Sequence, residues 1–190
     1  MLARITVSFA IALFLLASSA GMAQAKYFSF ILVDRNALTL PLPPGWSAKL
    51  LPSESAVFAT ARIEPKESER SVVLVTPFMA GPSAPPNFYA PDNIRRTVES
   101  FAADALPRAV EDQLTVKPIG GEKVGYVFSA TDKSLVGRSV QPGEYLYVMQ
   151  GLIVVGELLC NFTILTNEWP SPDAEKALEM LRGAEHHSGS

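Results

Sequence analysis

The sequence predicts an α+β fold, in which one antiparallel sheet of about six to seven strands and two main helices form an α/β/α sandwich. Short runs rich in Val, Ile, Leu and Phe recur along the chain and are bounded by Pro and Gly. Two other segments repeat apolar residues at helical spacing. The order is several strands, a helix, several strands and a second helix. Because each helix must bury an apolar stripe and a sheet offers two faces, we expect the helices to pack on the sheet.

The segment 1–25 predicts a cleavable export signal. Arg4 gives a basic start, residues 5–17 are almost entirely apolar, and Ala23-Gln24-Ala25 supplies an A-x-A cleavage site. We expect cleavage after Ala25 and a periplasmic or secreted protein without stable membrane insertion. An uncleaved anchor is the alternative, but the apolar run is shorter than the roughly 20 residues that span a bilayer.

Residues 26–184 are expected to form a single domain, and the polar segment 185–190 a flexible tail. Pro43-Pro44-Gly45 fixes a tight corner early in the domain. The charged loop 64–70 suits a connection between neighbouring antiparallel strands. The strands predicted in the first half span residues 27–33, 37–42, 56–63 and 71–78.

A proline-rich loop at 81–91 leads into the first helix. Asp92 is placed to cap this helix and Pro107 to end or kink it. Its apolar residues fall on one face, which we expect to cover the sheet: Ile94, Val98, Phe101, Ala102, Ala105 and Leu106.

The second half of the domain predicts four more strands and the second helix. Gly120-Gly121 is a turn, and Gly156-Glu157 closes a hairpin, with Gly151 as the alternative turn. Ser171 caps a helix that begins at Pro172 and ends at Gly183. The strands span 115–118, 122–131, 145–155 and 158–166, and the helix has an apolar stripe of Ala174, Ala177, Leu178 and Leu181.

Cysteine and histidine usage excludes several kinds of site. Cys160 is the only cysteine, so an intramolecular disulfide is excluded. It alternates with Leu158 and Phe162, which predicts a buried and unreactive thiol. The only histidines, His186 and His187, lie in the predicted tail, whereas Ser-His-Asp or Cys-His catalysis needs a histidine within the fold. We therefore expect no catalytic residue, no metal site and no cofactor.

The charge balance excludes another class of partner. The formal net charge is −3, and because the predicted signal carries only Arg4, the mature chain carries −4. No basic run or basic helix is present. A nucleic-acid partner is therefore not expected.

One feature of the organisation is shared with a known superfamily. An early strand leads into Leu42-Pro43-Pro44-Gly45-Trp46, then a hairpin and the helix 93–106. The turn Gly120-Gly121-Glu122-Lys123, a hairpin ending in 162–166 and a terminal helix follow. This arrangement resembles the PsbP-like superfamily, which includes a photosystem II subunit, a nuclear-import factor and exported bacterial proteins of unknown function. The resemblance implies an α/β/α sandwich of PsbP-like type and a non-enzymatic adaptor or assembly role, without naming a partner.

The candidates for contact with a ligand or partner are Trp46, Phe88, Tyr89, Arg95 and Arg96. Phe88 and Tyr89 lie in the proline-rich loop, where presenting them would cost little entropy; the competing view is that both rings cover the first helix. Trp46 would line a cleft with them or pack over a sheet edge. Arg95 and Arg96 would clamp an anion or form a solvated helix face.

These observations favour an exported, non-catalytic binding or accessory domain that contacts a protein of the cell envelope or a small ligand. The alternative is a small hydrolase or transferase of the cell envelope that works without histidine. A buried carboxylate with a shifted pKa in a deep cleft would favour the enzyme, and a shallow apolar patch would favour binding.

Overall fold

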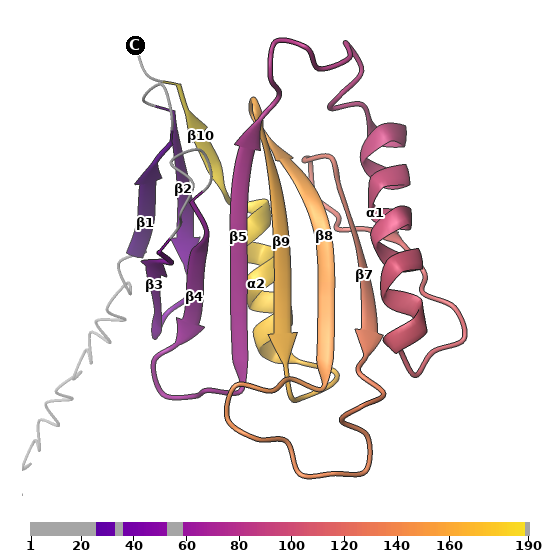
Figure 1. Ribbon diagram of the computed structural model, residues 1–190. Coiled ribbons are helices and arrows are strands. Elements are labelled where there is room, and N and C mark those ends of the chain that lie inside the picture. Colours follow the sequence, from indigo (N-terminus) through magenta and orange to yellow (C-terminus); the bar gives the residue numbers. More distant parts are fainter. Residues whose placement is uncertain (1–25, 33–35, 53–58, 189–190) are drawn as a thin grey trace, which may run out of the picture.

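The computed structural model describes residues 26–32, 36–52 and 59–188 (Figure 1). The predicted signal at 1–25 and part of the predicted strand at 56–63 lie outside the described residues. The main element is an antiparallel sheet with the strand order β3-β4-β5-β9-β8-β7-β6. Its strands are β3 (Trp46–Leu50), β4 (Ala61–Pro65), β5 (Ser71–Met79), β6 (Lys117–Pro118), β7 (Gly125–Thr131), β8 (Tyr147–Val155) and β9 (Leu158–Thr166).

The two helices, α1 (Pro91–Ala105) and α2 (Pro172–Arg182), cover opposite faces of this sheet, and Figure 1 shows α1 in front of it and α2 behind. The alternation of side chains along each strand produces this division. In β9, Phe162 belongs to the core on the α2 side, whereas Leu159, three positions earlier and therefore on the other face of the strand, belongs to the core on the α1 side. The predicted α+β class with two main helices on a largely antiparallel sheet is confirmed.

A second sheet of three strands, β1 (Lys26–Ile31), β2 (Ala37–Leu42) and β10 (Glu185–His187), has the order β1-β2-β10. Leu38 and Leu40 of β2 are fully buried in the core on the α2 side. The first two predicted strands therefore form a separate layer and do not join the main sheet.

The strand β10 corrects the prediction of a flexible tail beginning at residue 185. Its residues pair with 37–39 of β2. The ring of His186 is half-buried, with Nε2 2.9 Å from Asn36 Oδ1 and Nδ1 accepting a hydrogen bond of 3.3 Å from the Glu157 N–H. The tail was expected to be free because it is polar, but backbone pairing does not require apolar side chains.

The capping prediction is confirmed for one helix and wrong for the other. Ser171 Oγ accepts a hydrogen bond of 3.3 Å from the Ala174 N–H at the start of α2. The helix α1 instead begins at Pro91 after Ala90, which gives no side-chain cap, so Asp92 lies inside the first turn. A short 3₁₀ helix, η2 (Leu106–Arg108), continues from α1 and contains Pro107.

The predicted burial of Cys160 is confirmed, and its low reactivity remains a prediction. Its side chain is 1% exposed, and burial raises the pKa of the thiol to about 12. At neutral pH the thiol is therefore protonated and shielded from reagents. Among the described helices, none is long and apolar enough to cross a membrane.

Candidate functional site

The contact role predicted for Trp46 is wrong. Its side chain is only 3% exposed and belongs to the core on the α2 side. The tight corner is present, with Gly45 at a φ of 79° and the Trp46 N–H donating to the Pro43 carbonyl at 3.1 Å. That corner turns the chain into β3, an edge strand that we did not predict, and directs the indole inward.

Phe88 and Tyr89 are half-buried and pack against the core on the α1 side. Their rings meet edge to face, with centroids 5.0 Å apart. The Tyr89 hydroxyl accepts a hydrogen bond of 3.0 Å from the Ala80 N–H and donates one of 2.6 Å to the Glu157 carbonyl. These contacts fasten the proline-rich loop to the β8–β9 turn and favour the competing view, in which the rings stabilise the fold.

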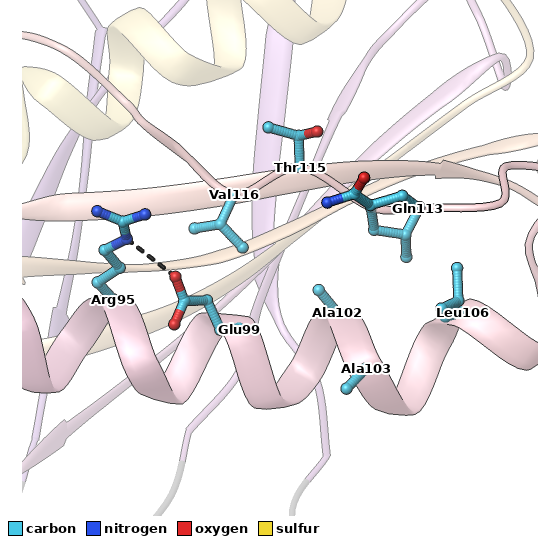
Figure 2. A pocket seen from close by; sticks show the side chains of 9 residues that line it. Arg95, Glu99, Ala102, Ala103, Leu106, Gln113, Thr115 and Val116 are labelled. Atoms are coloured by element: carbon cyan, nitrogen blue, oxygen red, sulfur yellow. Dashed lines mark hydrogen bonds and ion pairs between the residues drawn. The ribbon is translucent and has the colours of Figure 1, made fainter.

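Arg95 and Arg96 do not converge on a common ligand position. The Arg95 Nε donates to Glu99 Oε1 at 2.9 Å, whereas the Arg96 Nη2 donates to Asn93 Oδ1 at 3.2 Å. Figure 2 shows the Arg95–Glu99 pair at the rim of a cavity of about 400 Å³ between α1 and the segment 113–116. Each guanidinium has its own partner on the helix, which is the arrangement of a solvated helix face.

A second cavity, of about 410 Å³, lies between α2 and the segment 111–119. We call it the α2 groove. The helix α2 packs on β9, β5 and β2. Beside it, the same face of the sheet over β7 and β8 forms the floor of the groove. Its lining includes Glu111, Lys117, Met149, Trp169, Glu175 and Arg182.

Trp169 is the exposed aromatic residue of the α2 groove. Its side chain is 47% exposed, and its ring centroid lies 5.9 Å from that of Tyr147. The residue stands in the loop between β9 and α2, close to the Ser171 cap. An indole that remains this accessible offers an apolar face and an N–H donor to a ligand.

The loop that carries Trp169 is held by hydrogen bonds from Asn167. The Asn167 Oδ1 accepts from the Leu146 N–H at 2.7 Å, and Nδ2 donates to the Glu144 carbonyl at 2.9 Å. The backbone N–H of Asn167 donates to the Arg70 carbonyl at 3.1 Å. The start of the loop is thus tied to the β4–β5 connection and to the β7–β8 connection.

Buried hydroxyl groups at the two ends of the same loop are also hydrogen-bonded to one another. Ser71 Oγ donates to Thr166 Oγ1 at 3.2 Å, and Thr166 Oγ1 lies 3.2 Å from Ser171 Oγ. All three side chains are buried. Because hydrogen bonds hold both ends of the loop, the backbone at Trp169 is positioned before any ligand arrives, which lowers the entropy cost of binding.

Glu111 forms the opposite wall of the α2 groove as a fixed hydrogen-bond acceptor. Its carboxylate oxygens lie 3.1 and 3.0 Å from the Thr131 N, and Oε1 also accepts from Thr131 Oγ1 at 2.7 Å. Burial raises the pKa of this carboxyl, but the hydrogen bonds from Thr131 and from the backbone of Val110 and Glu111 together outweigh burial and leave the pKa below its ordinary value. Glu111 is therefore ionised at neutral pH.

Arg182 completes the far end of the α2 groove. Its Nε donates to the Ile119 carbonyl at 2.8 Å, which ties the end of α2 to the segment 111–119. Lys117 and Glu175 line the groove between these anchors and are exposed. With Glu111 and Glu175 negative and Lys117 and Arg182 positive, the formal charges of the lining balance.

We did not predict Trp169 as a site residue, although its sequence context resembles that of Phe88 and Tyr89. Each aromatic segment lies in a loop just before a helix that begins with proline. The sequence shows the loop but not which rings the fold will cover. Within the described ranges, no three or more His, Cys, Asp or Glu residues gather in a way that could hold a metal ion.

Comparisons with known proteins give a distant structural similarity. No family model matches the chain, and no curated protein matches it. The chain is similar to a protein of Bacteroides thetaiotaomicron VPI-5482 of known crystal structure, with 13% sequence identity and a TM-score of 0.49. The match covers 88% of this chain and 49% of the Bacteroides chain, so this chain spans about half the length of that protein.

Proposed function

We propose that this protein is an exported, non-catalytic binding or accessory domain that contacts a protein or a small ligand in the cell envelope, and that the α2 groove is its contact site. The observation that carries the proposal is the 47% exposure of Trp169 on a loop held by Asn167 and by buried hydroxyl groups. An exposed tryptophan held in place in this way is typical of a binding anchor.

Export is part of the proposal. It rests on the sequence pattern of residues 1–25, with a basic start, an apolar run and the A-x-A site that ends at Ala25. The PsbP-like resemblance is a further prediction and points to the same adaptor class. Intact-mass measurement of the exported protein tests this part: a mass that begins at Lys26 supports export with cleavage, and a membrane-embedded species that retains Met1 contradicts it.

The chemistry of Glu111 supports binding over the enzyme alternative. A general acid needs a pKa near the working pH, which burial achieves by raising the pKa of a carboxyl. The hydrogen bonds from Thr131 shift the pKa of Glu111 in the other direction. An ionised carboxylate accepts hydrogen bonds from a ligand but cannot serve as the general acid of a hydrolase or transferase.

Affinity capture from the exported fraction, with the mature chain as bait, tests the contact site. We expect Trp169→Ala to lose the captured partner or ligand and to keep the melting temperature of the native chain. Leu50→Ala is the matched control, because Leu50 is also 47% exposed but lies on the edge strand β3. Equal capture by both variants would refute the α2 groove as the contact site.

A further inference from the structure

We infer that the α2 groove binds a neutral saccharide, with one face of a pyranose ring stacked on the indole of Trp169. This inference rests on the proposed function and names its ligand class. Three features support it: the exposed ring of Trp169, the balanced charges of the groove lining, and the edge of β7, whose backbone groups are already paired on both sides of Ser129.

The indole of Trp169 supplies the stacking surface. The face of an aromatic ring carries partial negative charge. The C–H bonds on one face of a pyranose ring are weakly polarised in the opposite sense and form a flat apolar surface. Trp169 packs on Tyr147 yet keeps 47% of its side chain exposed, and the loop is already fixed. A flat sugar ring therefore meets a flat, rigid partner.

The polar lining favours an uncharged ligand with many hydroxyl groups. Glu111 is a fixed acceptor, and Thr115 and Ser129 add hydroxyls that both donate and accept. The formal charges of Glu111, Glu175, Lys117 and Arg182 cancel, so an anion or a cation would meet a like charge as well as an opposite one. A sugar hydroxyl both donates and accepts hydrogen bonds, so it can bind the carboxylates of the lining as well as its cationic side chains.

The closed edge of β7 argues against an extended peptide as the ligand. The Val110 N–H donates to the Thr131 carbonyl at 2.9 Å, and Glu111 occupies the Thr131 N–H. Further along, β6 pairs with residues 126–127 of β7. A peptide that adds a strand needs a row of unpaired backbone groups, and these contacts occupy that row on both sides of Ser129.

The size of the α2 groove also fits a small ligand. A cavity of about 410 Å³ lies near the lower end of the range of roughly 300–1,000 Å³ for small-molecule sites. This volume suits a short oligosaccharide segment rather than a folded protein domain.

Iodide quenching of tryptophan fluorescence tests the inference on the full mature chain. Trp46 is 3% exposed, so iodide reaches Trp169 and leaves Trp46 largely untouched. We expect chitotriose, cellotriose or maltotriose at millimolar concentration to protect Trp169 from iodide, and glucose 6-phosphate to protect it less. By calorimetry, Trp169→Ala should abolish sugar binding, Glu111→Gln should weaken it about tenfold, and Leu50→Ala should leave it unchanged.

The outcomes separate the sugar from the wider proposal. Failure of all three neutral sugars to protect Trp169, stronger protection by glucose 6-phosphate, or unchanged sugar binding by Trp169→Ala would each overturn the saccharide assignment. If the chain still captures a protein through Trp169 in that case, the proposed binding function stands without the sugar. If Trp169→Ala affects neither sugar binding nor capture, both proposals fail.

Discussion

Two aromatic pairs lie near the starts of the two helices, and the fold uses them differently. Phe88 and Tyr89 lie before α1, whereas Trp169 lies before α2 and its ring contacts that of Tyr147. The loops that carry them leave opposite ends of the sheet, after β5 and after β9 (Figure 1). The first pair is half-buried against the core on the α1 side, and Trp169 is 47% exposed.

The difference lies in what holds each loop. In the proline-rich loop, the aromatic residues themselves form the anchor, because the Tyr89 hydroxyl bonds to Ala80 and Glu157. In the β9–α2 loop, Asn167 and the buried hydroxyls of Thr166 and Ser171 form the anchor. The hydrogen bonds that anchor this loop therefore come from residues other than Trp169. An aromatic loop residue is available for binding when other groups already hold its loop.

The largest expected effect is on stability, from replacing Phe88 and Tyr89 together by Ala. The double variant loses two half-buried rings and the hydrogen bonds of one hydroxyl, so we expect the free energy of unfolding to fall by about 3–5 kcal/mol. Tyr89→Phe isolates the hydroxyl and should cost about 1–2 kcal/mol. Urea unfolding measures both.

Thiol labelling provides an independent check of that double variant. Cys160 is buried in the native chain and should resist labelling without denaturant. The Phe88→Ala/Tyr89→Ala variant should be labelled faster because the sheet opens more often. An unchanged melting temperature with lost partner capture would instead make the proline-rich loop the contact site.

The next effect concerns the anchor of the Trp169 loop. Asn167→Ala removes two side-chain hydrogen bonds, to the Leu146 N–H and the Glu144 carbonyl. We expect a loss of about 1–3 kcal/mol in the free energy of unfolding and faster motion of the Trp169 indole, measured by fluorescence anisotropy. If the indole remains as rigid as in the native chain, Asn167 is not what positions it.

The smallest effect is on the pH dependence of stability through Glu111. Its pKa is lower in the folded chain than in the unfolded chain. The stability it contributes is therefore complete above the ordinary carboxyl pKa and is lost as the pH falls through the lowered value. Glu111→Gln should flatten this acidic part of the curve of unfolding free energy against pH. An equally steep curve in the variant would show that other carboxyls dominate.

The fold class was predictable from local signals, and the site was not. Alternation placed Cys160 on a buried face, and the Ser171-Pro172 pair marked the start of α2. Trp46 was misjudged because its burial depends on the layers packed on the α2 side of the sheet. The strand β10 was missed because His186 meets Asn36 across 150 positions of the chain.

The exposure of Trp169 has the same non-local origin. The sequence shows an aromatic residue in a loop, but the contacts of that loop come from Arg70, Glu144 and Leu146, far from it in the chain. The same holds for Phe88 and Tyr89, whose anchor is the distant Glu157 carbonyl. Both loops place aromatic residues just before a helix that begins with proline, so this local pattern could not assign their roles.

Hydrogen exchange of the chain, free and bound to the ligand or partner it retains, tests the division between the two aromatic pairs most directly. We predict that binding slows exchange in 111–119 and 167–182, the two walls of the α2 groove, and leaves the loop 81–91 unchanged. Slower exchange confined to 81–91, with the walls of the α2 groove unaffected, would contradict the account.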